Sequence, residues 1–317
     1  MNDAPNSAAK TKPKIRLGTR NSPLAMAQAV ETRARLCVAH GWDENEVELV
    51  PVVASGDKVL DRPLAEIGGK ALWTKELDAW LADGQIDAAV HSAKDVETIR
   101  PDVFHFASFL PRADRRDALV GAASIADIPK GAVVGTSAPR RASQLLNLRP
   151  DCRVVTFRGN VATRLGKLNA GEADVTFLAA AGLERLGQSD VGAPLDEEAW
   201  VPAAAQGVIA LECRADDLAV TAALAAIDDA ATRAELEAER ALLAGLGGTC
   251  HSPIAVLCRS ADGSSLSMRA ALFSPDGTER IEGETTFTAG DHAPVKALAA
   301  DLLARATPGI APHFGGT

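Results

Sequence analysis

Residues 132–157, AVVGTSAPRRASQLLNLRPDCRVVTF, contain a complete strand–helix–strand unit. The valines of 132–136 predict a short buried strand, and Pro139 is typical of the first turn of a helix. The run 153–157 predicts a second strand. Two strands joined through one helix favour a parallel pair, because parallel strands need a long crossover connection. This unit therefore predicts a mixed α/β fold with a mostly parallel sheet.

The same alternation precedes this unit. Residues 14–19 and 47–55 predict strands on either side of a helix that begins at Pro23, with Ser22 as its N-cap. Residues 87–92, DAAVHS, predict a buried strand that ends in polar residues. Ligands of α/β proteins bind outside the carboxyl ends of such strands, so we expect functional residues directly after them.

The pattern changes near residue 228. A helix is predicted over 232–246, three strands over 253–259, 265–273 and 280–287, and a last helix near 295–306. Helix, three strands and helix are typical of a small α+β domain with an antiparallel sheet.

Charge and composition limit the function classes. The chain has 317 residues, with 33 Lys and Arg against 42 Asp and Glu and a net charge of −9. This acidic balance disfavours nucleic-acid binding through a basic surface. No stretch reaches the about 18 consecutive apolar residues of a membrane span, and the polar start MNDAPNSAAKTKPK lacks the apolar segment of a secretory signal. We therefore expect a cytoplasmic protein that binds neither nucleic acid nor membranes.

The cysteines favour neither a disulfide framework nor a metal site. They are odd in number and form no C-x-x-C pair. We therefore expect free thiols and no metal at Cys37, Cys152, Cys213, Cys250 and Cys258.

Arginines recur at predicted helix starts that follow strands: Arg20, Arg140, Arg141, Arg158 and Arg164. A cation in the first helical turn is locally unfavourable, because the helix dipole prefers negative charge there. A bound carboxylate or phosphate would resolve the conflict, since free N–H groups and guanidinium groups both bind anions. A single arginine of this kind is more often a solvated surface residue, but the recurrence favours an anion site.

Two further stretches carry candidate chemistry. In HSAKD, Lys94 and Asp95 follow the predicted strand; they form either a structural pair or a carboxylate that exchanges protons and stabilises a developing cation. We interpret His91 as a hydrogen-bonded core or turn residue. In GGTCHSPIAV, paired glycines place Cys250 in a turn. Its thiol is either a buried apolar group or an accessible nucleophile, and both interpretations stay open on these residues alone.

Taken together, these stretches resemble the porphobilinogen deaminase family. The resemblance spans about residues 15–256 and follows the order of the family's motifs. They are IRLGTRNSPLAMAQA, GDKVLDRPLAEIGGKALWTKELD, DAAVHSAKDV, GTSAPRRASQL, FRGNVATRLGKL, LAAAGLERLG, PAAAQGVIALECR and GGTCHSPIAV.

The resemblance implies an activity and a cofactor. Enzymes of this family join four porphobilinogen molecules into the linear tetrapyrrole hydroxymethylbilane and release ammonia at each addition. They build it on a covalently attached dipyrromethane made from the same substrate. The family acts as a monomer, and this chain is expected to do the same.

The resemblance also implies two domains like type II periplasmic binding proteins and a third, smaller α+β domain. The stretch PAAAQGVIALECR would return to the first domain after the second is complete. We expect a disordered tail over 1–13, domain 1 over 14–110 and 202–226, domain 2 over 111–201, and domain 3 over 227–317.

Roles follow for the matching residues. Asp95 would be the catalytic carboxylate, contacting pyrrole N–H groups and assisting loss of the aminomethyl nitrogen, and Cys250 would hold the cofactor through a thioether. Further cofactor ligands would be Lys94, Asp95, Ser137, Arg140, Arg141, Arg158 and Gly159. The substrate carboxylates would be bound by Arg20, Ser22, Ser92, Arg158, Arg164, Arg185 and Gln206. Lys70 and Trp73 would belong to a loop that covers the cleft, although Trp73 also fits the apolar stripe of a predicted helix.

The chain departs from the family pattern at two places. Ala138 and Pro139 stand where relatives usually carry serine and leucine, which removes one hydroxyl contact. The usual glycine before Gln206 is also missing, so a close approach of the backbone there is in doubt.

Two other functions remain as alternatives. A non-catalytic anion-binding protein with the same two-domain architecture is one, since such folds serve many functions. A cysteine hydrolase using Cys250 and His251 is another. It is disfavoured, because adjacent residues seldom reach the geometry of a nucleophile and its base.

Overall fold

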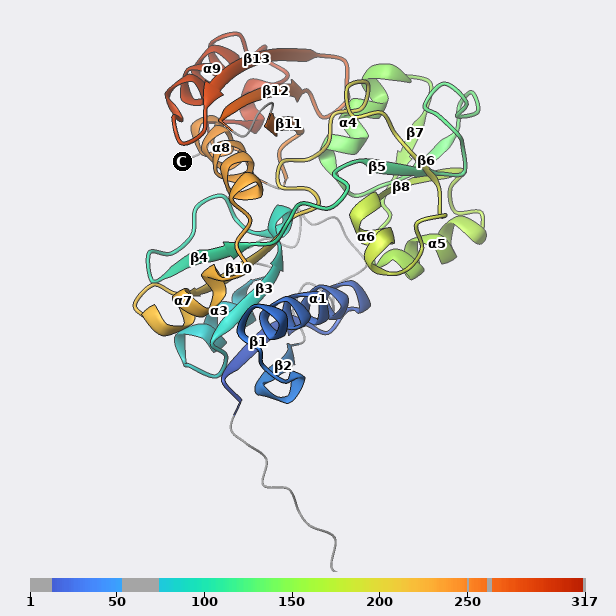
Figure 1. Cartoon of the computed structure of the whole chain (residues 1–317). Helices are drawn as coiled ribbons and strands as arrows, with labels where there is room; N and C mark the ends of the chain where they lie inside the picture. Colours follow the sequence, from blue (N-terminus) through green and yellow to red (C-terminus); the bar gives the residue numbers. More distant parts are fainter. Residues whose placement is uncertain (1–12, 53–73, 250, 261–263, 316–317) are drawn as a thin grey trace, which may run out of the picture.

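Three sheets organise the residues that the structure, a computed structural model, describes: 13–52, 74–249, 251–260 and 264–315 (Figure 1). Two of the sheets have five strands and one has three. The predicted mixed α/β class is confirmed. The division into three domains that we expect from the resemblance stays a prediction, and each sheet is described here by its strands.

The first sheet has the strand order β2 (Val47–Val52), β1 (Ile15–Arg20), β3 (Ala88–Ser92), β10 (Ile209–Arg214) and β4 (Phe104–Phe109). The strands β2, β1 and β3 are parallel, whereas β10 is antiparallel to both of its neighbours. The strand β10 is thus inserted into a sheet whose other strands lie more than a hundred residues earlier. The helices that contact strands of this sheet are α1 (Pro23–His40), α3 (Lys75–Ala82) and α7 (Leu218–Ala225).

Burial and capping explain the start of this sheet. Ile15 and Leu17 of β1 pack with Ala29 and Leu36 of α1, and all four are almost fully buried. The predicted N-cap is confirmed, because the Ser22 hydroxyl accepts a hydrogen bond from a backbone N–H of the first turn of α1. The strand predicted over 47–55 ends at residue 52 within the described residues.

The second sheet has the order β7 (Arg153–Val155), β6 (Val133–Gly135), β8 (Val175–Ala179), β5 (Asp117–Val120) and β9 (Ala193–Pro194). The predicted strand–helix–strand unit is confirmed as β6, α4 (Pro139–Leu148) and β7, with the two strands parallel. Two further helices follow β7 and β8: α5 (Val161–Asn169) and α6 (Ala180–Arg185). The strands β5 and β9 were not predicted.

The third sheet is antiparallel, in the order β11 (Ile254–Ser260), β12 (Ser265–Phe273) and β13 (Arg280–Thr288). It lies between α8 (Ala230–Leu246) and α9 (Ala293–Ala304) in the sequence, as predicted. Leu242, Val256, Met268 and Leu302 form its core and are almost fully buried. Short 3-10 helices occur at Glu44–Glu46, Ala93–Asp95 and Ala311–His313.

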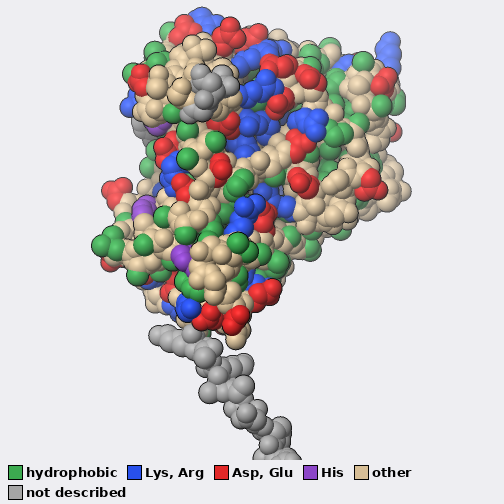
Figure 2. All heavy atoms as spheres, in the orientation of Figure 1, with side chains coloured by type: hydrophobic (Ala, Val, Ile, Leu, Met, Phe, Trp, Pro, Cys, Tyr) green, Lys and Arg blue, Asp and Glu red, His purple; other side chains and the backbone are tan. Residues whose placement is uncertain are grey.

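Arginine–carboxylate pairs join the third sheet and α8 to the rest of the molecule. Arg112 donates to both carboxylate oxygens of Glu239 on α8, each over 2.9 Å, and both side chains are buried. Farther out, Arg259 on β11 pairs with Glu197 and Glu198. Figure 2 shows positive and negative side chains intermingled on the upper part of this face. Exposed pairs of this kind contribute little stability, so the buried Arg112–Glu239 pair is the stronger constraint.

Ala205 takes the place of the missing glycine and is held in a strained conformation. Its φ of 62° makes it the one non-glycine residue with positive φ in the described part of the chain. The backbone N–H of Ala205 donates to Glu239 Oε2 over 2.6 Å, which fixes the turn before β10. A Cβ in this region costs about 1–2 kcal/mol, so Ala205 destabilises the folded state relative to glycine at this position.

Replacing Ala205 with glycine should therefore raise the free energy of unfolding, by about 1 kcal/mol. The matched control is Ala203→Gly two residues earlier, where φ is not positive and the added freedom of the unfolded chain should destabilise the protein. Urea unfolding at neutral pH measures both. A lower stability for Ala205→Gly would contradict the strain assigned to this residue.

Candidate active site

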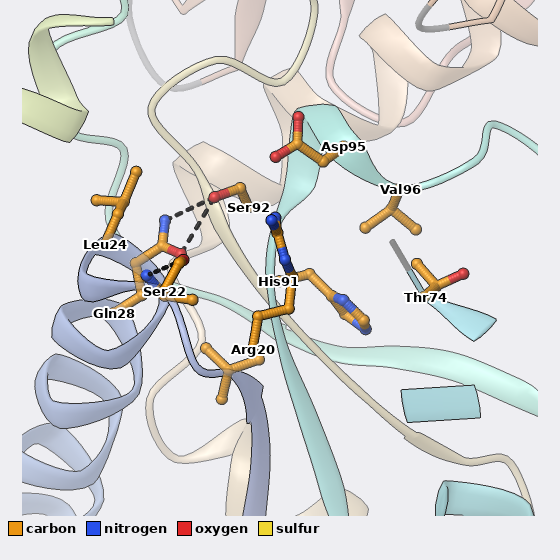
Figure 3. Close-up of a pocket in the computed structure, with 11 residues that line it drawn as sticks. Arg20, Ser22, Leu24, Gln28, Thr74, His91, Ser92, Asp95 and Val96 are labelled. Carbon is orange, nitrogen blue, oxygen red and sulfur yellow. Dashed lines mark hydrogen bonds between the residues drawn. The ribbon is translucent and has the colours of Figure 1, made fainter. Parts of the chain in front are cut away.

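A cavity opens at the carboxyl ends of β1 and β3, as expected for an α/β fold (Figure 3). Arg20 ends β1, Ser92 ends β3, and Asp95 ends the 3-10 helix that directly follows. Asp95 is the one acid among the described residues that line the cavity. The structure thus brings together three of the predicted site residues from two separate segments.

Polar side chains of α1 complete the cavity wall. Gln28 Nε2 donates to the Ser92 hydroxyl over 2.8 Å, and that hydroxyl lies 3.1 Å from Gln28 Oε1. Figure 3 shows Ser22 beside this pair and the Arg20 side chain extending between Ser92 and His91. Gln28 was not predicted as a site residue; it is buried on the inner face of α1, and its polar character there was the available signal.

His91 lines the cavity and belongs to a buried hydrogen-bond network with Glu212 and Arg100. Its Nε2 atom is 3.2 Å from Glu212 Oε2 on β10, and Arg100 donates to both Glu212 oxygens over 2.8 Å. Burial alone would raise the pKa of Glu212, but the hydrogen bonds from His91 and Arg100 outweigh it and lower the pKa to about 2. His91 is therefore a hydrogen-bonded core residue, as interpreted. Glu212 and Arg100 were not predicted.

Arg140 and Arg141 converge on one buried carboxylate that was not predicted either. Asp117, the first residue of β5, is fully buried and accepts from the Nη2 atoms of Arg140 and Arg141 over 2.7 and 2.6 Å. Trp200 Nε1 and Gln206 Nε2 also donate to it, each over 2.8 Å. Burial would raise the pKa of Asp117, but the two guanidinium groups hold it well below its usual range.

Gln206 connects this cluster to the catalytic candidate. Its Oε1 atom accepts from Lys94 Nζ over 3.1 Å, while its Nε2 atom donates to Asp117. Lys94 precedes Asp95 directly. Burial lowers the pKa of Lys94 to about 8; Asp95 opposes this shift, and Arg141 adds to it. Lys94 and the nearby Arg140 and Arg141 thus outnumber the two nearby carboxylates, Asp95 and Asp117.

The loop before α5 carries two more predicted ligands, Arg158 and Gly159, and α5 itself carries Arg164. Gly159 has a φ of 111°, and a Cβ there would lie 2.7 Å from Thr163, so only glycine fits. Arg164 Nε donates to the Gly159 carbonyl over 2.9 Å. Burial, followed by Arg141, lowers the pKa of Arg164 to about 10, with Asp95 opposing. Arg158 is buried, and the Ser137 hydroxyl donates to the Phe157 carbonyl.

Arg185, at the end of α6, reaches a second small cavity beside the first. Its Nε atom lies 3.1 Å from Glu31 Oε2 on α1, and its Nη2 atom donates to the Gly207 carbonyl over 3.2 Å. Lys94, Gln28 and Ser92 line the same cavity. The predicted ligands Arg185 and Lys94 therefore lie on one continuous cleft.

Three predicted site residues, Cys250, Lys70 and Trp73, lie outside the described residues. The chain on the N-terminal side of Cys250 is described: the Gly248 carbonyl accepts from the Thr98 hydroxyl over 3.0 Å. Thr98 follows Asp95 by three residues, so this hydrogen bond joins the segment of Asp95 to the segment of Cys250.

Within the described residues, no group of three or more His, Cys, Asp or Glu side chains is placed to hold a metal ion. The described helices include none that is long and apolar enough to cross a membrane. The described cysteines, Cys37, Cys152, Cys213 and Cys258, are free, and Cys258 is fully buried within β11.

Comparison with known proteins finds matches to a single protein family over most of the chain. Residues 15–222 match the family model described as porphobilinogen deaminase, dipyromethane cofactor binding domain, and residues 233–304 match its C-terminal domain. A porphobilinogen deaminase of Sphingopyxis alaskensis is 54% identical over 301 residues, covering 93% of this chain and 95% of that protein. One of Paracoccus denitrificans is 48% identical over 296 residues, covering 92% and 94%.

Among solved structures, the immunogenic lipoprotein A from Vibrio vulnificus has a TM-score of 0.41 and 12% sequence identity, covering 71% of this chain and 99% of that protein.

The Glu212 network gives a stability prediction with a definite pH dependence. Glu212→Gln should lower the free energy of unfolding by about 2 kcal/mol at pH 7, because Arg100 and His91 lose the charge of a fully buried hydrogen-bond acceptor, while Arg100 keeps its pairs with Asp78 and Glu97. The folded-state pKa of about 2 lies below the usual value of 4.5, so this contribution is present above about pH 4.5 and is lost toward pH 2.

Urea unfolding of both proteins at a series of pH values measures this difference. The gap between wild type and Glu212→Gln should narrow below about pH 4.5. Glu48→Gln, at an exposed position of β2, serves as the control and should change little. An equal gap at all pH values would contradict the assigned pKa.

Proposed function

Because this chain belongs to the porphobilinogen deaminase family, we propose that it is the transferase that joins four porphobilinogen molecules head to tail into hydroxymethylbilane, releasing ammonia at each addition. The observation that carries this proposal is the single acid of the described cavity wall, Asp95, set among cationic side chains. A non-catalytic anion-binding protein is not favoured, because the curated relatives are enzymes over nearly the whole chain.

The residues present fit a dipyrromethane group. Each of its pyrroles carries two carboxylates, and the cleft offers cations whose charge is poorly compensated. Lys94 and Arg164 have lowered pKa values, and Arg141 Nε is buried with no hydrogen-bond partner among the described residues. Bound carboxylates would supply the missing anions. We propose as its ligands Lys94, Asp95, Ser137, Arg140, Arg141, Arg158 and Gly159, with Cys250 as the attachment thiol.

When bound, the dipyrromethane supplies a tethered pyrrole carbon to which substrate units are added. The chain's own residues supply charge and position. Asp95 would accept hydrogen bonds from pyrrole N–H groups and stabilise the positive charge that develops on the substrate as its aminomethyl nitrogen leaves. Because the carboxylate is fixed beside β3, it is already in place when the charge appears.

We propose a second set of ligands, which shares Arg158 with the first, for the acetate and propionate groups of incoming porphobilinogen. Arg20 and Ser92 line the same cavity as Asp95, and Arg185 lies on the adjoining one. Guanidinium groups bind carboxylates through paired, charge-assisted hydrogen bonds. The full set is Arg20, Ser22, Ser92, Arg158, Arg164, Arg185 and Gln206.

The expectations on partners, location, oligomeric state and domain division are also part of this proposal. The net charge of −9 supports a protein that binds neither nucleic acid nor anionic membranes. We propose that it acts in the cytoplasm, because its sequence has no long apolar segment. A monomer, and a loop over the cleft that includes Lys70 and Trp73, follow from the family. The sheets support the proposed division into 14–110 with 202–226, 111–201 and 227–317, since β10 pairs with β3 and β4.

Asp95→Asn should nearly abolish turnover while leaving the fold intact, because it removes the stabilising charge but keeps the size of the side chain. A loss of at least about a hundredfold in kcat is expected. Asp102→Asn, at an exposed position seven residues later, is the matched control and should keep wild-type kcat. Release of product from porphobilinogen under saturating substrate is the assay. Ordinary activity of Asp95→Asn would refute the role of this carboxylate.

The covalent attachment has its own test, by intact mass spectrometry of the purified protein. Wild type should carry an added mass equal to two substrate-derived pyrroles and react with an aldehyde reagent for pyrroles. Cys250→Ser should have the mass of the bare chain, whereas Cys258→Ser should keep the addition, because Cys258 is buried within β11. An active wild-type protein without added mass would overturn the proposed cofactor.

A further inference from the structure

Glu31 and Arg185 form an ion pair across the cleft. Arg185 ends α6, which follows β8 of the second sheet, whereas Glu31 lies on α1, which packs on the first sheet. Their Nε and Oε2 atoms are 3.1 Å apart, and the side chains are 9% and 30% exposed. The two helices also meet at Gly182, where a Cβ would lie 3.4 Å from Leu24 (Figure 1). The pair therefore bridges the two halves of the active site.

The Glu31 carboxylate is shared between two arginines. Its Oε1 atom accepts from Nε and Nη2 of Arg35, one turn later on α1, over 3.3 and 3.2 Å. Its Oε2 atom faces Arg185. If Arg185 turned away, Glu31 would keep Arg35 as a partner and would remain partly hydrated. Separating Glu31 from Arg185 therefore costs little free energy on the side of Glu31.

Arg185 has only part of its guanidinium group available. Nε is occupied by Glu31 and Nη2 by the Gly207 carbonyl, while Nη1 has no hydrogen-bond partner among the described residues. A ligand carboxylate can bind an arginine through two parallel N–H groups only if one of these contacts is released. The contact to Glu31 is the one that a substrate anion can replace, because one carboxylate takes the place of another and Glu31 keeps Arg35 as a partner.

We propose that Glu31 is a positioning residue that competes with substrate carboxylates for Arg185, holding the guanidinium in the cleft until an anionic substrate displaces it. The proposal rests on the proposed role of Arg185 as a substrate ligand. Glu31 sets the affinity for substrate and the closure of α6 on α1; it takes no part in the chemistry at Asp95. Arg35 weakens this competition, because it donates to the same Glu31 carboxylate.

The test uses holoenzyme, two substitutions with opposite expected effects on KM, and the variant that combines them. Glu31→Gln should lower KM for porphobilinogen about two- to fivefold at low ionic strength, with kcat changed less than about twofold. Arg35→Gln should raise KM, because Glu31 then serves Arg185 alone. The double variant should behave like Glu31→Gln, since Arg35 acts only through Glu31. At about 1 M salt the differences should vanish.

Glu44→Gln is the matched control: Glu44, in the 3-10 helix after α1, pairs with Arg33 of α1 at 2.8 Å and forms no ion pair with α6 within the described residues. It should leave KM unchanged. Because KM is not always a binding constant, porphobilinogen binding to Asp95→Asn holoenzyme, with and without Glu31→Gln, is also measured by calorimetry. The Asp95→Asn protein that also carries Glu31→Gln should bind porphobilinogen more tightly than Asp95→Asn alone.

An unchanged or raised KM in Glu31→Gln, or a shift of the same sign in Arg35→Gln, would overturn the proposal. An inactive wild-type protein without added pyrrole mass would instead overturn the proposed function, so the two failures are distinguishable. A purely structural pair would move stability in all variants alike and would not give KM shifts of opposite sign.

Discussion

The buried carboxylate of Asp117 is the constraint on which the site depends. A charge without solvent must be paired, and this one accepts four hydrogen bonds from residues far apart in the sequence. Two of the donors are arginines, so the cluster keeps an excess of positive charge. The carboxylate thus positions Arg140 and Arg141 at the start of α4 and neutralises only part of their charge.

From Asp117 the constraint extends to the reacting carboxylate and to the third sheet. Gln206 contacts Asp117 on one side and Lys94 on the other, next to Asp95. The preceding residue, Ala205, is held by Glu239, which also binds Arg112. The turn 203–208 therefore joins all three sheets near the cleft, and its strained backbone is the cost of that junction. The Glu31–Arg185 pair is connected to the same turn, because Arg185 Nη2 donates to the Gly207 carbonyl.

Local patterns were sufficient for much of the fold. Strand and helix periodicity, the Ser22 cap and the α8–β11–β12–β13–α9 order were all predictable, because they depend on neighbouring residues. Asp117 and Glu212 were not, since each is an acid within an apolar strand whose partners lie more than twenty residues away. Their signal was the charge itself: an unexplained acid in a buried strand requires a cation. Ala205 shows the reverse, since its sequence gives no sign of the positive φ that the structure shows there.

The central claim is that Asp117 positions the cationic cleft for the anionic cofactor. The intact mass of the folded fraction of Asp117→Asn, purified at low temperature and compared with wild type, tests it most directly. The expected result is folded protein that mostly has the mass of the bare chain, because Arg140 and Arg141 have lost their position. Folded Asp117→Asn with the same added pyrrole mass as wild type would contradict the claim.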